Sequence, residues 1–134
     1  MQAATYTVPT SRTTLWVGYA ISALGVLFLL LDAVIKVLRL APAIEATVQL
    51  GYPEHLVLTI GLVELACLIV YMIPRTAVLG AILMAGYLGG AVTTHLRIGS
   101  EPFAVFFPVI LGLMLWGGLY LRDPQLRALI PLRR

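Results

Sequence analysis

Five ionisable residues lie within or at the ends of long apolar stretches of the chain: Asp32, Lys36, Glu64, His95 and Arg97. Asp32 and Lys36 are four residues apart, so on a helix they share one face and can form an ion pair. Glu64 is the only charged residue between Leu56 and Ile73. An ionisable group this deep in an apolar segment is costly unless it is paired or neutralised, and in a membrane protein it indicates a functional site.

Each of these residues also has a structural interpretation. Glu64 can be protonated, or it can hydrogen-bond to a neighbouring helix and serve packing. Lys36 can extend its stem toward the membrane surface with Asp32 as its partner. His95 can shuttle protons or donate to a ligand carbonyl, or it can be an interfacial histidine with a satisfied ring. Arg97 fits an anchor at the membrane surface better than a ligand clamp.

The composition indicates that the elements around these residues lie in a membrane. The chain has 134 residues, of which 60% are hydrophobic and 11% charged, and its mean hydropathy is +0.99. Soluble domains usually carry about 25% charged residues. A chain this short and apolar could not cover its surface with polar groups, so we expect one transmembrane domain, residues 1–134, and no separate soluble domain.

Four stretches are long and apolar enough to span a bilayer, approximately residues 15–38, 56–73, 77–95 and 103–121. Backbone groups in lipid must be paired within their own segment, so each stretch should be helical. Proline and glycine residues mark the short connections between them. These features predict an all-α fold, an integral membrane four-helix bundle with short loops. The stretch between Pro42 and Leu50 can form a short interfacial helix.

The first span could be mistaken for a signal peptide. It is long, it is followed by Asp32 and Lys36, and no small-residue cleavage pattern follows it. We therefore expect it to be retained as a helix.

The distribution of lysine and arginine predicts the orientation of the bundle. One side receives six basic residues, namely Arg12, Arg75, Arg122, Arg127, Arg133 and Arg134. The other side receives three, Lys36, Arg39 and Arg97. Because cytoplasmic loops carry the excess of basic residues, we expect a multi-pass protein of the cytoplasmic (inner) membrane with both termini in the cytoplasm.

In this topology the five ionisable residues converge. The first helix runs outward and the second runs back, so Asp32 and Lys36 share a depth with the outer half of the second helix, where Glu64 could meet either of them. His95 and Arg97 end the third helix on the same side. The sequence therefore predicts a polar pocket with apolar walls in the outer half of the bundle.

Several other kinds of site are not favoured. The sequence has no paired Cys and His spacing for a metal, no glycine-rich phosphate loop and no nucleophile elbow. Its one cysteine, Cys67, excludes an internal disulfide. The net charge of +3 does not indicate nucleic-acid binding, because the basic residues lie at the ends of apolar runs. A four-helix bundle can hold haem, but His55 and His95 are in different segments.

Small and aromatic residues predict packing rather than chemistry. Gly86 and Gly90 form a small-xxx-small pair that Thr94 continues, and such rows let helices approach closely, either inside a bundle or between subunits. Gly18 with Ser22 in the first span, and Gly112 in the fourth, offer partner surfaces. Four aromatic residues are expected in a belt at the cytoplasmic interface, Trp16, Tyr71, Trp116 and Tyr120. Tyr52 fits the belt at the opposite interface better than a site.

The order and spacing of several motifs resemble the DoxX-like family of small bacterial four-helix membrane proteins, over roughly residues 15–121. The motifs are the run from Asp32 to Lys36, the run from Gly51 to His55, the run from Gly61 to Glu64, and the run from Gly86 through His95 to Gly99. Lys36, Glu64 and His95 occupy the matching positions, and the resemblance supports a shared site there.

The resemblance implies a redox-associated role, because families of this type are similar to the membrane subunit of a thiosulfate:quinone oxidoreductase and some members are linked with oxidative stress. Under this hypothesis Lys36 or His95 would hydrogen-bond a quinone carbonyl and Glu64 would carry a proton. Whether the chain is an enzyme stays open. It has no recognised redox centre, so electron transfer would need a bound cofactor or a soluble or membrane redox partner.

Two other functions remain open. A non-enzymatic accessory or assembly protein would act through helix–helix interaction, using the glycine-rich third helix, and it could form homo-oligomers. A small transporter would need oligomers, since four helices are few for that task.

Overall fold

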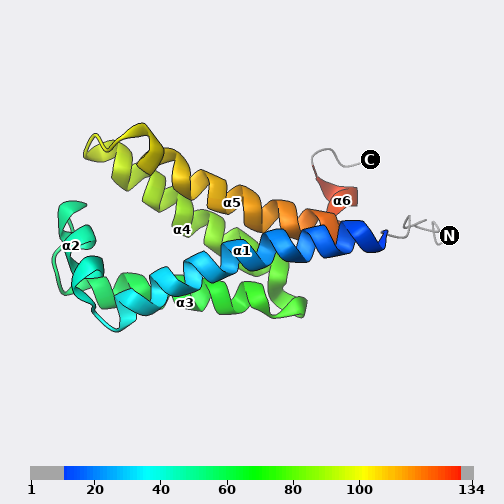
Figure 1. The fold of residues 1–134 in the computed structure, drawn as a ribbon, viewed down its shortest axis with the longest axis horizontal. Coiled ribbons are helices and arrows are strands. Elements are labelled where there is room, and N and C mark those ends of the chain that lie inside the picture. The colour runs from blue at the N-terminus through cyan, green and yellow to red at the C-terminus, as the bar shows by residue number, and fades with distance from the viewer. Residues whose placement is uncertain (1–10, 131–134) are drawn as a thin grey trace.

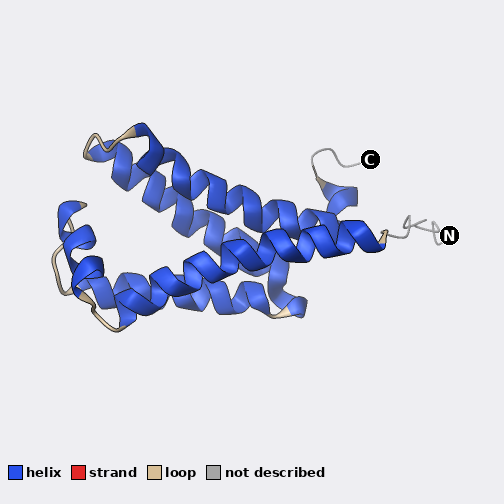
Figure 2. Cartoon of the chain, in the orientation of Figure 1, coloured by secondary structure: helices blue, strands red, loops and turns tan. Residues whose placement is uncertain are grey.

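The computed structural model describes residues 11–130, and within them all regular structure is helical, with no strand (Figure 2). The elements in chain order are α1 Arg12–Val37, α2 Ala41–Gln49, α3 Leu56–Met72, the 3₁₀ turn η1 Pro74–Thr76, α4 Ala77–Arg97, α5 Pro102–Arg122 and α6 Pro124–Leu129. The predicted all-α class is confirmed. Arg133 and Arg134, which entered the predicted topology, lie outside the described residues.

The four long helices form a ring. α1 contacts α3 and α5, and α4 contacts the same two helices from the opposite side (Figure 1). The short helix α2 lies at one end of the bundle and contacts α1 and α3. The first and last described helical turns lie together at the other end, beside the turn between α3 and α4 (Figure 1). The ring therefore has a closed end near the termini and an end that α2 covers in part.

Local sequence explains where the helices begin and end. The Ser11 side chain accepts a hydrogen bond from the Thr14 backbone at 3.2 Å and caps α1. Prolines at positions 42, 102 and 124 occupy first turns, where the missing N–H is not needed. Gly99 follows α4 with a φ of +69°, a conformation that glycine adopts without strain. The observed bounds lie within a few residues of the predicted ones.

The outer surface of the bundle is apolar. Large hydrophobic side chains point outward along the long helices, including Trp16, which is 71% exposed, and Leu24, Leu31, Leu96, Phe103 and Leu113. Three helical stretches are long and apolar enough to cross a membrane, Arg12–Val37, Pro74–Arg97 and Pro102–Arg122. The helix α3 is shorter, with 17 residues, or about 25 Å, near the lower limit for a span. The chain is thus an all-α membrane bundle.

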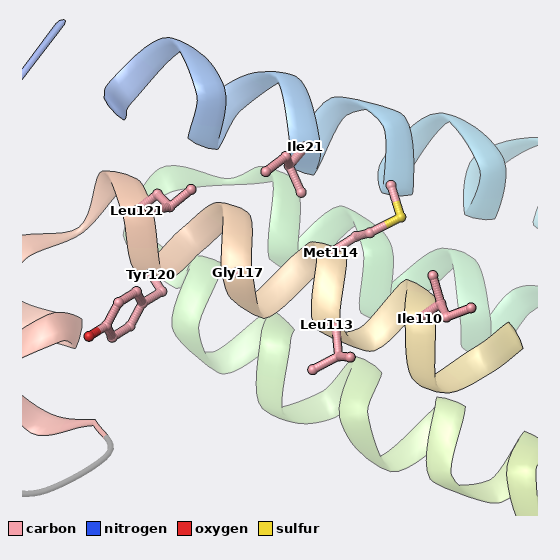
Figure 3. A pocket seen from close by; sticks show the side chains of 7 residues that line it. All are labelled: Ile21, Ile110, Leu113, Met114, Gly117, Tyr120 and Leu121. Carbon is pink, nitrogen blue, oxygen red and sulfur yellow. The ribbon is translucent and has the colours of Figure 1, made fainter. Parts of the chain in front are cut away.

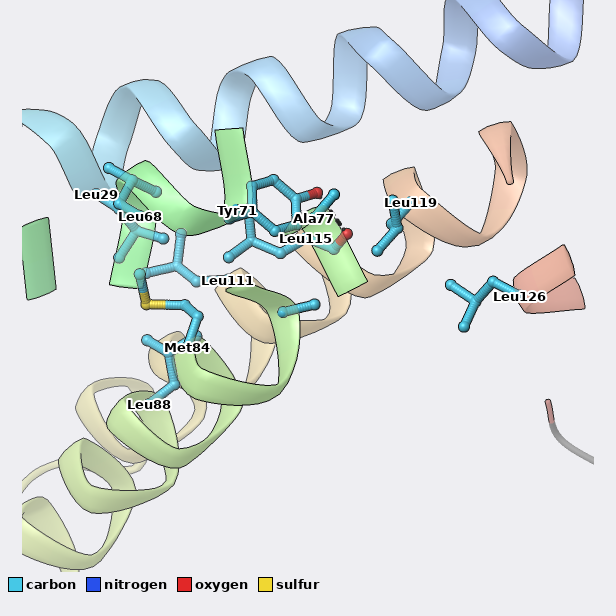
Figure 4. Close-up of a cluster of buried hydrophobic side chains, with 11 residues drawn as sticks. Leu29, Leu68, Tyr71, Ala77, Met84, Leu88, Leu111, Leu115, Leu119 and Leu126 are labelled. Atoms are coloured by element: carbon cyan, nitrogen blue, oxygen red, sulfur yellow. Dashed lines mark hydrogen bonds between the residues drawn. The ribbon is translucent and has the colours of Figure 1, made fainter. Parts of the chain in front are cut away.

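The core lies at the closed half of the ring and is built mainly from leucines (Figure 4). Tyr71 lies among them and is only 2% exposed. Its hydroxyl donates to the Leu115 carbonyl at 2.7 Å, drawn as a dashed line in Figure 4, and lies 2.9 Å from Ser22 Oγ. The prediction that Tyr71 belongs to an interfacial belt is therefore wrong, because its hydroxyl finds partners inside the bundle.

Close helix packing occurs at glycines other than Gly86 and Gly90, among them Gly18, which the sequence had indicated together with Ser22. An ideal Cβ at Gly80 would lie 2.2 Å from the Tyr71 backbone nitrogen, so α3 and α4 touch at this point. Gly18 and Gly118 bring α1 and α5 together in the same way. Gly86 and Gly90, in contrast, have no atom within 4 Å of the space a Cβ would fill, so they do not pack against another helix of the described chain. A contact with a second copy stays a prediction.

Candidate functional site

A cavity of about 650 Å³ lies among the helices at the end of the bundle that α2 covers in part. Its walls come from α1 to α5 and are largely apolar, with Phe28, Leu29, Phe107 and Leu111 among them. Its polar residues are Asp32, Lys36, Thr47, Gln49, Tyr52, Thr59, Glu64, Tyr87, Thr94, His95 and Ser100. The sequence prediction of a polar pocket in apolar walls agrees with this arrangement.

Four of these residues form one connected group, which we call the Lys36 cluster: Asp32, Lys36, Glu64 and Tyr87. The Lys36 ammonium donates to Asp32 Oδ2 at 2.5 Å, to Glu64 Oε2 at 2.8 Å and to Tyr87 Oη at 3.0 Å. The Tyr87 hydroxyl donates in turn to Glu64 Oε2 at 2.9 Å. The ion pair predicted from the spacing of Asp32 and Lys36 is present, and Glu64 meets Lys36 from the neighbouring helix.

A glycine one helical turn away sets the position of Glu64. Gly61 lies three residues before Glu64 on α3, and a Cβ at Gly61 would lie 2.7 Å from Lys36 Cβ and 3.3 Å from the Ala33 carbonyl oxygen. The absence of a side chain at this position lets α3 approach α1 closely. As a result, the short carboxylate side chain of Glu64 reaches the Lys36 ammonium on the facing helix.

Within the Lys36 cluster, side-chain burial increases from Asp32 through Lys36 to Glu64. The Glu64 side chain is fully buried, while those of Lys36 and Asp32 are 15% and 35% exposed. Glu64 Oε1 is buried without a hydrogen-bond partner among the described residues. Two carboxylates thus face one ammonium. Across residues 11–130 no three His, Cys, Asp or Glu side chains gather in a way that could hold a metal ion.

His95 and Arg97 differ in their relation to the cavity. His95 lines it, and its Nδ1 lies 3.0 Å from Ser100 Oγ, beyond the end of α4. The Arg97 guanidinium instead donates to the Leu50 carbonyl at 2.7 Å and lies over Gly51. Arg97 is not among the residues that line the cavity. It connects the end of α2 to the end of α4, and its predicted role as an anchor at the membrane surface stays a prediction.

Sequence reasoning missed Tyr87 and a second pair in the cavity wall. The Tyr52 hydroxyl lies 2.8 Å from Thr94 Oγ1. Tyr87, Ala91 and Thr94 follow the i, i+4, i+7 spacing of one helix face, and all three line the cavity. Tyr87 and Thr94 are two polar residues on one face of an apolar span, and this pattern is the sequence feature that could have indicated the cavity wall. The glycines Gly86 and Gly90 beside it belong to the cavity wall as well.

A second hollow, of about 400 Å³, lies between α1 and α5 near the closed end (Figure 3). It is lined by Ile21, Ile110, Leu113, Met114, Gly117, Tyr120 and Leu121. No charged side chain is among these seven residues. The hollow therefore offers contact for an apolar chain, and it lacks the groups that chemistry would need.

Comparison with known proteins gives one finding. A protein-family model described as the DoxX-like family matches residues 20–118, a stretch that contains His95 and the whole Lys36 cluster. No curated protein and no solved structure matches the chain.

Proposed function

The chain belongs to the DoxX-like family, and from that premise we propose that it is a redox-associated membrane protein that binds a quinone or a similar lipophilic ligand in the cavity beside the Lys36 cluster. The observation that carries this proposal is the cluster itself. Two carboxylates, an ammonium and a phenol are joined by hydrogen bonds at the wall of an otherwise apolar cavity.

The size and lining of the cavity support a ligand of this class. Small-molecule sites commonly measure about 300–1,000 Å³ and combine apolar walls with a few placed polar groups. At about 650 Å³ the cavity can hold a substituted ring and the first part of an isoprenoid or alkyl tail. Phe28 and Phe107, whose rings lie 4.8 Å apart between centroids, provide aromatic surface on one wall.

The energetic cost of burying the charged groups of the Lys36 cluster also supports a functional role for it. Burying an ion pair costs desolvation, and replacing such a pair by apolar residues is often neutral or stabilising. The cost of ionisable groups in a membrane span is why they usually mark ligand or proton paths. Packing alone would be served as well by leucine at position 64.

The proposal assigns roles to residues of the chain. Glu64 would hold or pass a proton at the ligand headgroup, and the His95 ring would lie within the same cavity as a further hydrogen-bonding group. Electrons would come from a redox partner, since the chain itself offers a binding site and not a redox centre.

Mass spectrometry of small molecules extracted from gently purified protein tests this function. We expect quinone or quinol to be enriched with the wild type and lost with Glu64→Gln. The matched control is Glu45→Gln, because Glu45 is exposed on α2 and does not line the cavity. Failure to find such a ligand with either the wild type or the control protein would count against the proposal.

A second candidate function rests on a different surface. Gly89 of α4 leaves open space where a side chain would lie, so at this position α4 could receive a helix of another copy or another protein. Gly89 does not line the cavity. Crosslinking in membranes would then be abolished by Gly89→Leu, while ligand content would not change.

We also propose that both termini face the cytoplasm and that the protein lies in the inner membrane of a bacterium. The distribution of basic residues supports this orientation, and it places the cavity in the outer half of the bilayer.

A further inference from the structure

The hydrogen bonds of the cavity wall indicate which chemical form of ligand it takes. Resting on the function proposed above, we propose that the headgroup oxygen that lies against the Lys36 cluster must donate a hydrogen bond, so that the cavity binds a quinol, which has a hydroxyl at this position, in preference to the corresponding quinone, which has only acceptor carbonyls.

The donors of the Lys36 cluster are all used within the cluster. An ammonium group has three N–H bonds, and those of Lys36 point to Asp32, Glu64 and Tyr87. The single hydroxyl proton of Tyr87 goes to Glu64 Oε2. A quinone carbonyl approaching this wall would find no free N–H or O–H, unless it displaced one of these charge-assisted bonds.

Three hydroxyl groups on the wall toward α2, those of Tyr52, Thr94 and Thr47, are engaged in the same manner. The side chains of Gln49, Thr59, His95 and Ser100 also line the cavity but lie outside the Lys36 cluster. Thr94 Oγ1 donates to the Gly90 carbonyl at 2.8 Å, so the Tyr52 hydroxyl must supply the proton for the bond between Tyr52 and Thr94. Thr47 Oγ1 donates to the Ala43 carbonyl at 2.8 Å. The protons of these three hydroxyls therefore point away from a ligand.

Acceptors are what the cluster has left. Within the described chain, Asp32 Oδ1 has no hydrogen-bond donor, and the Asp32 side chain is 35% exposed and lines the cavity. Glu64 Oε1 is a second acceptor of the cluster without a donor among the described residues, and it is fully buried. A quinol hydroxyl can donate to Asp32 Oδ1, whereas a quinone oxygen there would face a carboxylate oxygen, acceptor against acceptor.

Three probes with the same ring and the same decyl tail test this inference on purified protein in nanodiscs. They are a hydroquinone kept reduced, its quinone, and its bis-methyl ether, which has the shape of the hydroquinone without its O–H groups. We expect the hydroquinone to bind roughly tenfold or more tightly than either other probe, since a hydrogen bond to a charged acceptor has about that effect.

The outcomes separate this inference from the proposed function. Binding of quinone or ether as tightly as hydroquinone would overturn the donor requirement while leaving a lipophilic ligand site in place. Binding of none of the three would overturn both.

A variant that returns a donor to the wall gives a second, independent test. Tyr87→Phe frees one Lys36 N–H, so the preference for hydroquinone over quinone should shrink several-fold, mainly through tighter quinone binding. Tyr120→Phe is the matched control, because Tyr120 lies in the separate hollow between α1 and α5 and should leave the preference unchanged.

Asp32→Asn provides a check that does not depend on Tyr87. The amide adds an N–H donor at the position of the free carboxylate oxygen, so it should also reduce the preference. An unchanged ratio of affinities in both folded variants would contradict the inference.

Discussion

Lys36 is the single positive charge between the carboxylates of Asp32 and Glu64. The net charge that remains in the cluster after a substitution therefore determines how strongly that substitution should destabilise the protein. If Glu64 is replaced, Lys36 and Asp32 remain as a balanced pair on one helix face. If Lys36 is replaced, Asp32 and the fully buried Glu64 remain together without a cation. Breaking a buried ion pair from one side is costly because it leaves a buried charge uncompensated.

We therefore predict that Lys36→Met destabilises the protein by about 3–5 kcal/mol, and that Glu64→Leu costs only about 1–3 kcal/mol, the effect of leaving one Lys36 N–H without an acceptor. Unfolding in detergent micelles, followed by the loss of helical circular dichroism, measures both. The ranking is the decisive result. Equal destabilisation by the two substitutions would show that the charge balance of the cluster does not control its stability.

A second prediction at this scale concerns the hydroxyl of Tyr71. It is bonded to Ser22 and to the Leu115 carbonyl inside the core, and the Arg122 guanidinium lies 3.4 Å away. Tyr71→Phe should reduce the free energy of unfolding by about 1–3 kcal/mol, because it leaves buried partners unsatisfied.

Tyr120→Phe is the comparison for Tyr71→Phe, and it should change stability by less than about 0.5 kcal/mol, as expected where no buried partner is lost. If both phenylalanine variants unfold alike, the buried hydroxyl of Tyr71 contributes nothing to the core.

Spacing alone predicted some residue contacts and could not predict others. The pair of Asp32 and Lys36 follows from helix periodicity, and the meeting of Lys36 with Glu64 follows from two helices that run in opposite directions. Tyr71 was misplaced because a tyrosine near the end of a span suits both a lipid interface and a core. The contact of Arg97 with Leu50 depends on the path of a loop, which periodicity does not describe.

At the scale of helices, hydropathy identified every long helix, and proline and glycine marked the breaks between them. The order of neighbours around the ring could not be read in the same way. Most of each span's surface is apolar, and the few polar residues mark the cavity side of a helix without showing which helix lies next to it. The close contacts at Gly61, Gly80 and Gly118 become visible only when backbones are placed in space, whereas Gly18 with Ser22 was expected from the sequence as a packing surface.

These contacts predict opposite effects for two alanine substitutions on α4. Gly80→Ala would set a Cβ against the Tyr71 backbone, which cannot rotate away, so α3 and α4 must separate. The expected loss is about 1–3 kcal/mol or more, as for other overpacked cores. Gly86→Ala meets nothing within 4 Å and should leave stability unchanged or raise it by up to about 1 kcal/mol through helix propensity.

Thermal unfolding of the two variants in the same detergent measures this difference. A Gly86→Ala protein as unstable as Gly80→Ala would mean that α4 packs against another chain at Gly86, as the glycine row suggested from sequence. Chemical crosslinking of the wild type would then identify that second copy.

For the whole molecule, the described basic residues divide between the two ends of the bundle, and the proposed orientation rests on this division. Both ends of the described chain, the turn with Arg75, and Arg12, Arg122 and Arg127 lie at one end of the bundle (Figure 1). At the other end, Lys36 is turned into the cavity and paired with two carboxylates, so it does not act as a loop charge. Arg39 and Arg97 remain there, against Arg12, Arg75, Arg122 and Arg127 at the end with the termini.

The orientation predicts which face of the protein a membrane-impermeant maleimide reaches in intact cells. Cys67 is the only cysteine, so Cys67→Ala gives a background without thiols. Glu45→Cys on α2 and Gln125→Cys on α6 then place single exposed thiols at opposite ends of the bundle, at positions that remove no basic residue. We expect Glu45→Cys to be labelled in intact cells and Gln125→Cys only after lysis, because the basic end stays in the cytoplasm. The reverse pattern would place the cavity in the inner half of the bilayer, where a ligand would exchange protons with the cytoplasm instead.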